Sequence, residues 1–226
     1  MMNGSGRIIA IADIHGCSRE FKALLQQISP DPANDTLIIL GDVIDRGYDS
    51  EGVIRELIEL KDVFRQKMIW LAGNHEDDLV QRNAQKHFFI HPPRDALSTY
   101  IRLFSELPLI YETEECVFVH AGFNGDPDDR QIILRDRSVL NGERIYQGKL
   151  YISGHSPFHK HSFTPLAQPL YIDETGQCHI VYDGMKLPEK GAIFIDTGCV
   201  YKNRLTAFII AQDHTIQISF VKFIGI

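Results

Sequence analysis

The apolar run over residues 36–40 constrains the fold more than any other feature of the sequence. It ends at a glycine and is followed at once by Asp42, Asp45 and Arg46. Such a run is typical of a buried parallel strand, and open α/β sheets bind their ligands at the carboxyl edge of their strands. Taken alone, the segment is as well explained by an acidic loop that caps the helix after it.

Three further apolar runs end in the same way, in residues that bind metals through oxygen or nitrogen. They are residues 8–12 before Asp13 and His15, residues 68–72 before Asn74 and His75, and residues 116–119 before His120. Four unrelated helix caps are a poor explanation for four such endings. We therefore expect these side chains to meet at one edge of a sheet.

Together the segments resemble the phosphoprotein phosphatase branch of the binuclear metallophosphoesterases. The resemblance spans residues 7–208 and rests on five motifs: Asp13-x-His15, Gly41-Asp42-x-x-Asp45-Arg46-Gly47, Gly73-Asn74-His75-Glu76, His120-Ala121-Gly122 and Gly154-His155. It implies a four-layer α/β/β/α sandwich in a single domain over residues 1–226. A small helical insertion near residues 83–107 is expected to lie over the site, where this family carries lids.

Periodicity by itself predicts an α/β fold. Alternating strands and helices over the first 85 or so residues predict a parallel sheet, with helices over residues 18–28 and 50–60, the first capped by Ser18, and a third beginning near Asn74. A further helix is predicted over residues 95–107. Short alternating runs after His120 predict an antiparallel second half.

Composition excludes several classes of function. A net charge of −7 and a pI near 5.8 argue against a nucleic-acid surface, although bound cations would still let the site accept phosphate. No apolar run is long enough for a transmembrane helix, and the first residues do not form a signal peptide. The four cysteines form no C-x-x-C pair, so a cytoplasmic location with reduced thiols is expected. Nothing in the sequence indicates the oligomeric state.

The resemblance implies a set of metal ligands. Asp13 and His15 would hold one divalent ion, and Asp42 would bridge it to a second. Asn74, His120 and His155 would complete the second site. Mixed oxygen and imidazole ligands suit Mn²⁺, which we expect, and also Fe or Zn²⁺.

The resemblance also implies a catalytic set. His75 would be the general acid that protonates the leaving group, and Asp45 would favour its protonated form. Arg46 would grip the phosphate oxygens. A second arginine is expected after the apolar run at residues 132–134, where Arg135 is favoured over Arg137.

Plainer readings stand beside these. Each of His120 and His155, considered alone, is more simply a hydrogen-bonded core histidine, and Asn74 a helix cap. Asp196 is expected to orient a ligand histidine, and Cys199 to pack. The remaining histidines are expected on the surface or in loops: His87, His91, His159, His161, His179 and His214. For His159 and His161 a minor role in substrate contact is left open.

Three functions compete. The leading prediction is hydrolysis of phosphoserine and phosphothreonine in proteins, with a small phosphoester as another possible substrate. The alternative is symmetrical hydrolysis of dinucleoside tetraphosphates, which needs an aromatic wall for the base. The candidates for that wall are Phe88, Phe89, Phe158 and Tyr201, although plain packing is the simpler reading of Phe88 and Phe89. The third, a degenerate phosphoprotein-binding module, predicts lost ligands, and every motif position is present.

Overall fold

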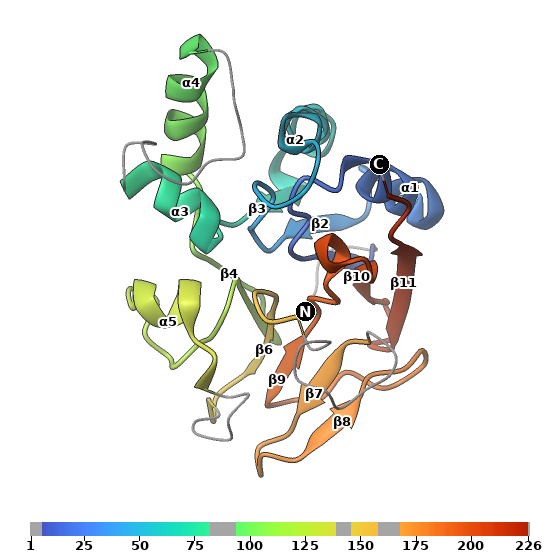
Figure 1. The fold of residues 1–226 in the computed structure, drawn as a ribbon. Coiled ribbons are helices and arrows are strands. Elements are labelled where there is room, and N and C mark those ends of the chain that lie inside the picture. The colour runs from blue at the N-terminus through green and yellow to red at the C-terminus, as the bar shows by residue number, and fades with distance from the viewer. Residues whose placement is uncertain (1–5, 82–93, 139–145, 158–167, 226) are drawn as a thin grey trace.

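Two facing sheets form the centre of the molecule in a computed structural model that describes residues 6–81, 94–138, 146–157 and 168–225. Figure 1 shows the two sheets with helices on their outer sides. The strand order is β11-β10-β1-β2-β3 in the first sheet and β4-β5-β6-β9-β7-β8 in the second.

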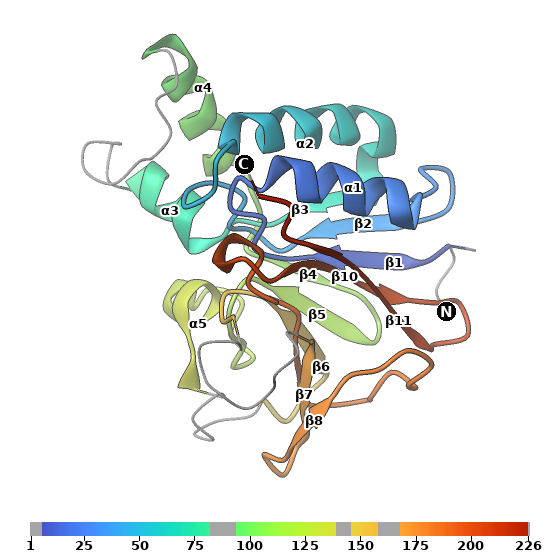
Figure 2. The same ribbon diagram turned by 45° about the vertical axis from the view of Figure 1, so that its right-hand side comes forward.

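The first sheet begins as the sequence predicts. β1 (Ile8–Ile11), β2 (Thr36–Ile39) and β3 (Met68–Trp70) run parallel, with Ile8 opposite Thr36 and Leu37 opposite Met68. The crossover helices are α1 (Ser18–Ile28) and α2 (Ser50–Phe64), followed by η1 (Arg65–Lys67), and α3 (Asn74–Gln81) follows β3. In Figure 2 α1 and α2 lie side by side on the outer face of this sheet.

Alternating side chains of the first sheet serve two cores. Ile9 and Ile11 pack with Phe21 of α1, whereas Ile8 and Ala10 pack against the second sheet. Both faces of a central parallel strand are thus buried, which explains why these strands read as continuous apolar runs.

The second sheet contains six strands. They are β4 (Ile110–Glu112), β5 (Cys116–Val119), β6 (Leu150–Ser153), β7 (Leu170–Ile172), β8 (Cys178–Ile180) and β9 (Ala192–Phe194). On its outer face Ile133 and Leu134 of α5 (Arg130–Arg135) pack with Val119 and Tyr151. The order helix, sheet, sheet, helix confirms the predicted α/β/β/α sandwich.

The prediction of an antiparallel second half is wrong in part. β5, β6 and β9 are mutually parallel, because long connections, one of them through α5, return the chain to the same end of the sheet. The last two strands, β10 (Arg204–Ile210) and β11 (Ile216–Lys222), are antiparallel as expected, but they join the first sheet, where β10 pairs with β1.

Two helix details also differ from prediction. Cys17, not Ser18, is the N-cap residue of α1, because the Ser18 hydroxyl donates to the Asp49 carboxylate at 2.7 Å instead of capping the helix. α2 continues to residue 64, four residues further than predicted. No helix in the described part of the chain combines the length and the apolarity needed to cross a bilayer.

The predicted insertion contains α4 (Arg94–Ser105). Phe104 buries its ring in the first core, 5.9 Å from the ring of Trp70. α4 is therefore anchored by Phe104 in the core of the first sheet. Residues 82–93, with the predicted aromatic wall of Phe88 and Phe89, lie outside the described residues.

Candidate metallophosphoesterase site

The carboxyl ends of five strands bring the six predicted ligands to one place. Asp13 and His15 follow β1, Asp42 follows β2, Asn74 opens α3 behind β3, His120 follows β5 and His155 follows β6. All six are buried at 9% exposure or less. Both sheets contribute, so the site lies at a shared edge of the sandwich.

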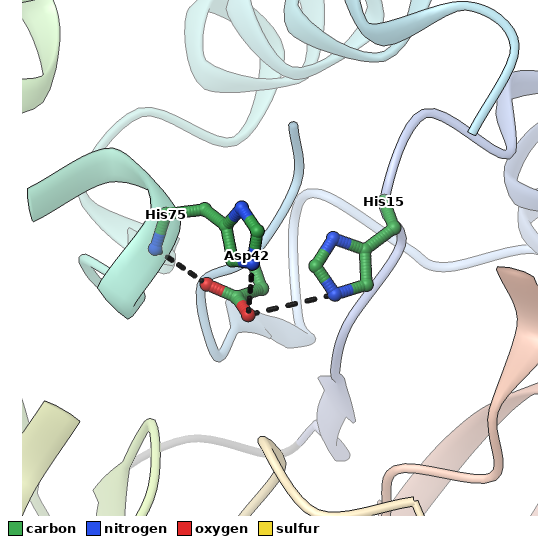
Figure 3. Close-up of side chains that lie close together, drawn as sticks. All are labelled: His15, Asp42 and His75. Carbon is green, nitrogen blue, oxygen red and sulfur yellow. Dashed lines mark hydrogen bonds and ion pairs between the residues drawn. The ribbon is translucent and has the colours of Figure 1, made fainter. Parts of the chain in front are cut away.

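Asp42 lies between two imidazoles, as Figure 3 shows. Its Oδ2 is 3.5 Å from Nε2 of His15 and 3.9 Å from Nε2 of His75. Nδ1 of His15 lies 2.8 Å from the carbonyl oxygen of Ile44, to which it donates, so Nε2 carries the lone pair. Oδ2 of Asp13 is 4.0 Å from the same Nε2. Asp13, His15 and Asp42 thus surround one position.

The other oxygen of Asp42 faces a second group of ligands. Its Oδ1 is 3.5 Å from Nε2 of His120, which lies 3.1 Å from both Oδ1 of Asn74 and Nδ1 of His155. Nδ1 of His120 is 2.7 Å from the carbonyl oxygen of Leu40 and donates to it, which leaves Nε2 to accept. One carboxylate therefore reaches two adjacent sets of oxygen and nitrogen atoms, the donor chemistry of a binuclear divalent-metal site.

His75 is held differently from these ligands. Its Nδ1 lies 2.6 Å from Oδ2 of Asp45, and its backbone N–H donates to Oδ1 of Asp42 at 3.0 Å. Burial lowers the pKa of His75, but the bond to Asp45 and the charge of Asp42 outweigh it and raise the pKa above its ordinary value. Nε2 is left to face the site, with 18% of the side chain exposed.

The neutral imidazoles and crowded carboxylates of the site favour bound cations. Burial lowers the pKa of His15 to about 3 and also lowers that of His120, so both imidazoles are neutral, as metal ligands must be. Burial raises the pKa of Asp42, but the positive charge of His75 and the hydrogen bond from the His75 backbone N–H hold this pKa below its ordinary value. Burial, Asp196 and Asp42 raise the pKa of Asp13. Divalent ions fit this donor set because they compensate the crowded carboxylates.

Six site residues adopt left-handed backbone conformations that side chains other than glycine rarely take. Their φ angles are 48° for Asp13, 45° for His15, 49° for Asp42, 67° for Asp45, 65° for Arg46 and 65° for His155. Such residues cost of order 1–3 kcal/mol each and persist where the surroundings enforce them. Here hydrogen bonds between neighbouring loops do so, among them that from the His15 N–H to the Asp42 carbonyl at 2.9 Å.

Glu76 is a positioning residue to which the sequence reading gave no role. Its buried carboxylate accepts hydrogen bonds from the backbone N–H groups of Gly73, Asp42, Val43 and Ile44, at 2.8–3.4 Å. It thereby fixes the loop after β2 against the start of α3. The available signal was the spacing of Gly73 and Glu76, because an acidic residue at the third helical position commonly bonds back to the N-cap.

The three arginines near the site have different partners. Nη1 of the exposed Arg46 lies 2.7 Å from Nε2 of His15. Nη2 of Arg135 is 3.1 Å from Oδ1 of Asp78, and Nη2 of Arg137 is 3.4 Å from the carbonyl oxygen of His155. Arg46 and Arg137 thus contact ligand residues directly, whereas Arg135 is held by a carboxylate of α3; the preference for Arg135 stays a prediction.

Other predicted residues have mixed outcomes. The Asp196 carboxylate accepts from the Gly198 N–H at 2.9 Å, and the structure gives it no hydrogen bond to a ligand histidine. Tyr201, in η4 (Cys199–Tyr201), has its ring centre 6.0 Å from the Arg46 guanidinium. His179 and His214 are on the surface, as predicted. Four of the remaining candidates lie outside the described residues: His87, His91, His159 and His161, together with Phe158.

Comparison with known proteins gives the site a family context. The sequence model of the calcineurin-like phosphoesterases matches residues 6–179. A symmetrical bis(5′-nucleosyl)-tetraphosphatase from Nitrosomonas europaea is 32% identical over 67% of this chain. The matched region is 59% of that relative's length. An asymmetrical bis(5′-nucleosyl)-tetraphosphatase from Anoxybacillus flavithermus is 27% identical over 92% of both chains.

The fold has relatives with other activities as well. The structure of a protein serine/threonine phosphatase from Saccharomyces cerevisiae matches with a TM-score of 0.68 and covers 99% of this chain and 82% of that one. At 13% identity, this likeness concerns the fold alone.

Proposed function

The chain belongs to the calcineurin-like phosphoesterase family, and we propose that it hydrolyses dinucleoside tetraphosphates with the help of two divalent ions. The observation that carries this proposal is the relatives' activity: tetraphosphatases match the chain in sequence, one of them across 92% of both lengths. These matches favour tetraphosphate hydrolysis over hydrolysis of phosphoproteins, because the protein phosphatase reported above shares the fold alone.

The ligand geometry supports a distribution of the two ions. Asp13 and His15 would hold one ion, Asn74, His120 and His155 the other, and Asp42 would contact both. Mn²⁺ is the ion we propose, on the mixed oxygen and nitrogen donors. Bound ions activate water as a nucleophile and stabilise the charge that develops on phosphate.

The chain's own residues would then bind and orient the phosphate group. The lone pair on Nε2 of His15 now accepts from Arg46. If His15 holds an ion through this lone pair, the Arg46 guanidinium would be free to bind two oxygens of one phosphate, which its forked shape suits. Tyr201 beside Arg46 offers a ring on which a nucleobase or ribose can rest, within reach of the same phosphate chain.

His75 would serve as the general acid. Its raised pKa favours the protonated ring, and its Nε2 faces the site while Nδ1 is held by Asp45. A proton delivered from Nε2 would leave with the departing phosphate oxygen. Asp45 therefore acts through His75, as the residue that fixes its orientation and its charge.

The test offers the full chain two substrates side by side. Protein stripped of metal and resupplied with Mn²⁺ is incubated with diadenosine tetraphosphate and with a phosphothreonine peptide, and the products are separated by anion exchange. Cleavage of the tetraphosphate supports the proposal. Two ADP molecules would indicate symmetrical cleavage, the alternative that the sequence offered, and ATP with AMP asymmetrical cleavage. Phosphate released from the peptide alone would replace the proposal with a protein phosphatase.

A matched variant connects the activity to the site. His75→Asn should abolish turnover of the tetraphosphate while the metal content stays that of the wild type. Unchanged turnover in this variant would remove His75 from the acid role and leave the substrate assignment intact.

A further inference from the structure

A second cluster of ligand-type side chains lies behind the phosphoesterase site. Sγ of Cys17, a carboxylate oxygen of Glu20 and Sγ of Cys199 all lie within 4.8 Å of one another. Their residues are 0%, 0% and 1% exposed. We propose that these three residues form a third metal site, built for a thiophilic ion such as Zn²⁺.

The donor set and its spacing fit zinc. Two thiolates and one carboxylate are ligands that zinc takes in proteins, and soft sulfur ligands select it against Mn²⁺ or Mg²⁺. Zn–S bonds of about 2.3 Å in a tetrahedron place neighbouring ligand atoms roughly 3.5–3.8 Å apart. The three side chains would therefore close around an ion with small rotations, as three of its four ligands.

The buried carboxylate of Glu20 is an independent sign of a bound cation. It accepts hydrogen bonds from the Tyr48 hydroxyl at 2.6 Å and from the backbone N–H groups of Ile224 at 2.7 Å and Gly225 at 3.4 Å. No cationic side chain of the described residues forms an ion pair with it. Buried charges in proteins are paired or bind metals, and hydrogen bonds of this kind orient metal-binding carboxylates.

An ion here would tie together distant parts of the chain. Cys17 and Glu20 belong to the start of α1, Cys199 belongs to η4, and Glu20 holds the segment at Ile224. Cys17 is two residues beyond His15, so the ion would stiffen the loop that carries this ligand without contacting the substrate. The competing fate of the same pair is a Cys17–Cys199 disulfide.

Cobalt(II) distinguishes this cluster from the phosphoesterase site, which contains no thiolate. The full chain is stripped of metal under reducing conditions and titrated with Co²⁺, and the near-ultraviolet absorption from thiolate-to-cobalt charge transfer is recorded. We expect one equivalent of Co²⁺ to produce this band. Cys17→Ser and Cys199→Ser should each weaken it, and the double variant should abolish it. Cys116→Ser, which removes a buried thiol from another core, should keep the full band.

Three results would overturn the proposal. They are no band in wild-type protein, a band that persists in the double variant, and a Cys17–Cys199 disulfide in freshly purified chain, seen as a loss of two hydrogens in its mass. A second measurement needs no variant and so does not depend on their folding. Zinc-edge X-ray absorption of wild-type chain loaded with zinc should show sulfur at about 2.3 Å, and a shell of only oxygen and nitrogen would contradict the site.

Discussion

Replacing Asp45 by Asn tests the acid role of His75 with little change to the structure. Asn has the same size, and it tolerates the left-handed backbone that residue 45 adopts, with φ at 67°. The backbone N–H of residue 45 keeps its bond to Oγ of Ser50, at 3.0 Å. What disappears is the negative charge 2.6 Å from Nδ1 of His75.

The size of the effect follows from that contact. A hydrogen bond between charged partners contributes about 1.5–3 kcal/mol, and one pKa unit corresponds to about 1.4 kcal/mol. The His75 side chain is only 18% exposed, so solvent screening is modest. The pKa of His75 should therefore fall in the variant, because its protonated form loses about 1.5–3 kcal/mol of stabilisation.

The direction in which the pH profile shifts follows from which protonation state of His75 is active. An acid catalyst works below its pKa, so kcat/KM declines as pH rises through the pKa of His75. Because Asp45 raises that pKa, the decline in Asp45→Asn should begin at a lower pH than in the wild type. The assay is kcat/KM for the tetraphosphate against pH at saturating Mn²⁺. An unshifted decline with a uniformly lower rate would refute the electrostatic role and leave Asp45 as a spacer.

The pair of His75 and Asp45 also affects the free energy of unfolding. A histidine whose folded pKa is raised adds stability that is complete below its unfolded pKa of about 6.5 and is lost as pH rises through the folded pKa. The difference in unfolding free energy between wild type and Asp45→Asn should thus shrink toward alkaline pH. Urea unfolding at several pH values measures it, and a difference that grows with pH would contradict the assignment.

Four further substitutions test other parts of the site. Glu76→Gln should lower the free energy of unfolding by about 2 kcal/mol, because the amide NH₂ cannot accept from the backbone N–H groups that the carboxylate now serves; an unchanged urea midpoint would argue against it. Gly154→Ala should weaken Mn²⁺ binding by roughly 10- to 100-fold in calorimetric titration, since the added carbon would lie 2.2 Å from Oδ1 of Asp13; wild-type affinity would show that Asp13 can move without loss. Arg135→Ala should lower kcat/KM by roughly 10- to 100-fold and Arg137→Ala far less, and the reverse order would move the clamp to Arg137.

Much of the fold could be predicted because its signals are local. The buried strands are continuous apolar runs, and Asp13, Asp42 and His120 follow such runs directly. Parallel strands with helical crossovers leave few possible arrangements. The convergence of the ligands was therefore expected from the sequence, while their catalytic roles stay a prediction.

What could not be predicted depends on contacts between distant residues. The direction of β6 follows from the path through α5, a six-residue helix too short for a clear periodic signal. Cys17 and Cys199 looked scattered because only the folded chain brings them together. The positive φ angles at the ligands are enforced by neighbouring loops; Asp and His adopt them more readily than most residues, but their presence alone does not show where such angles occur.

The pairing of β1 with β10 has a consequence for synthesis of the protein on the ribosome. Ile11 pairs with Ala207, so the second edge of β1 stays uncovered until 196 further residues have been made, a delay of roughly 10–40 s at about 5–20 residues per second. During that time the nascent chain presents an apolar strand edge that other chains can join. We expect folding to be completed only when β10 and β11 have left the ribosome, and dependence on chaperones to be greatest before that point.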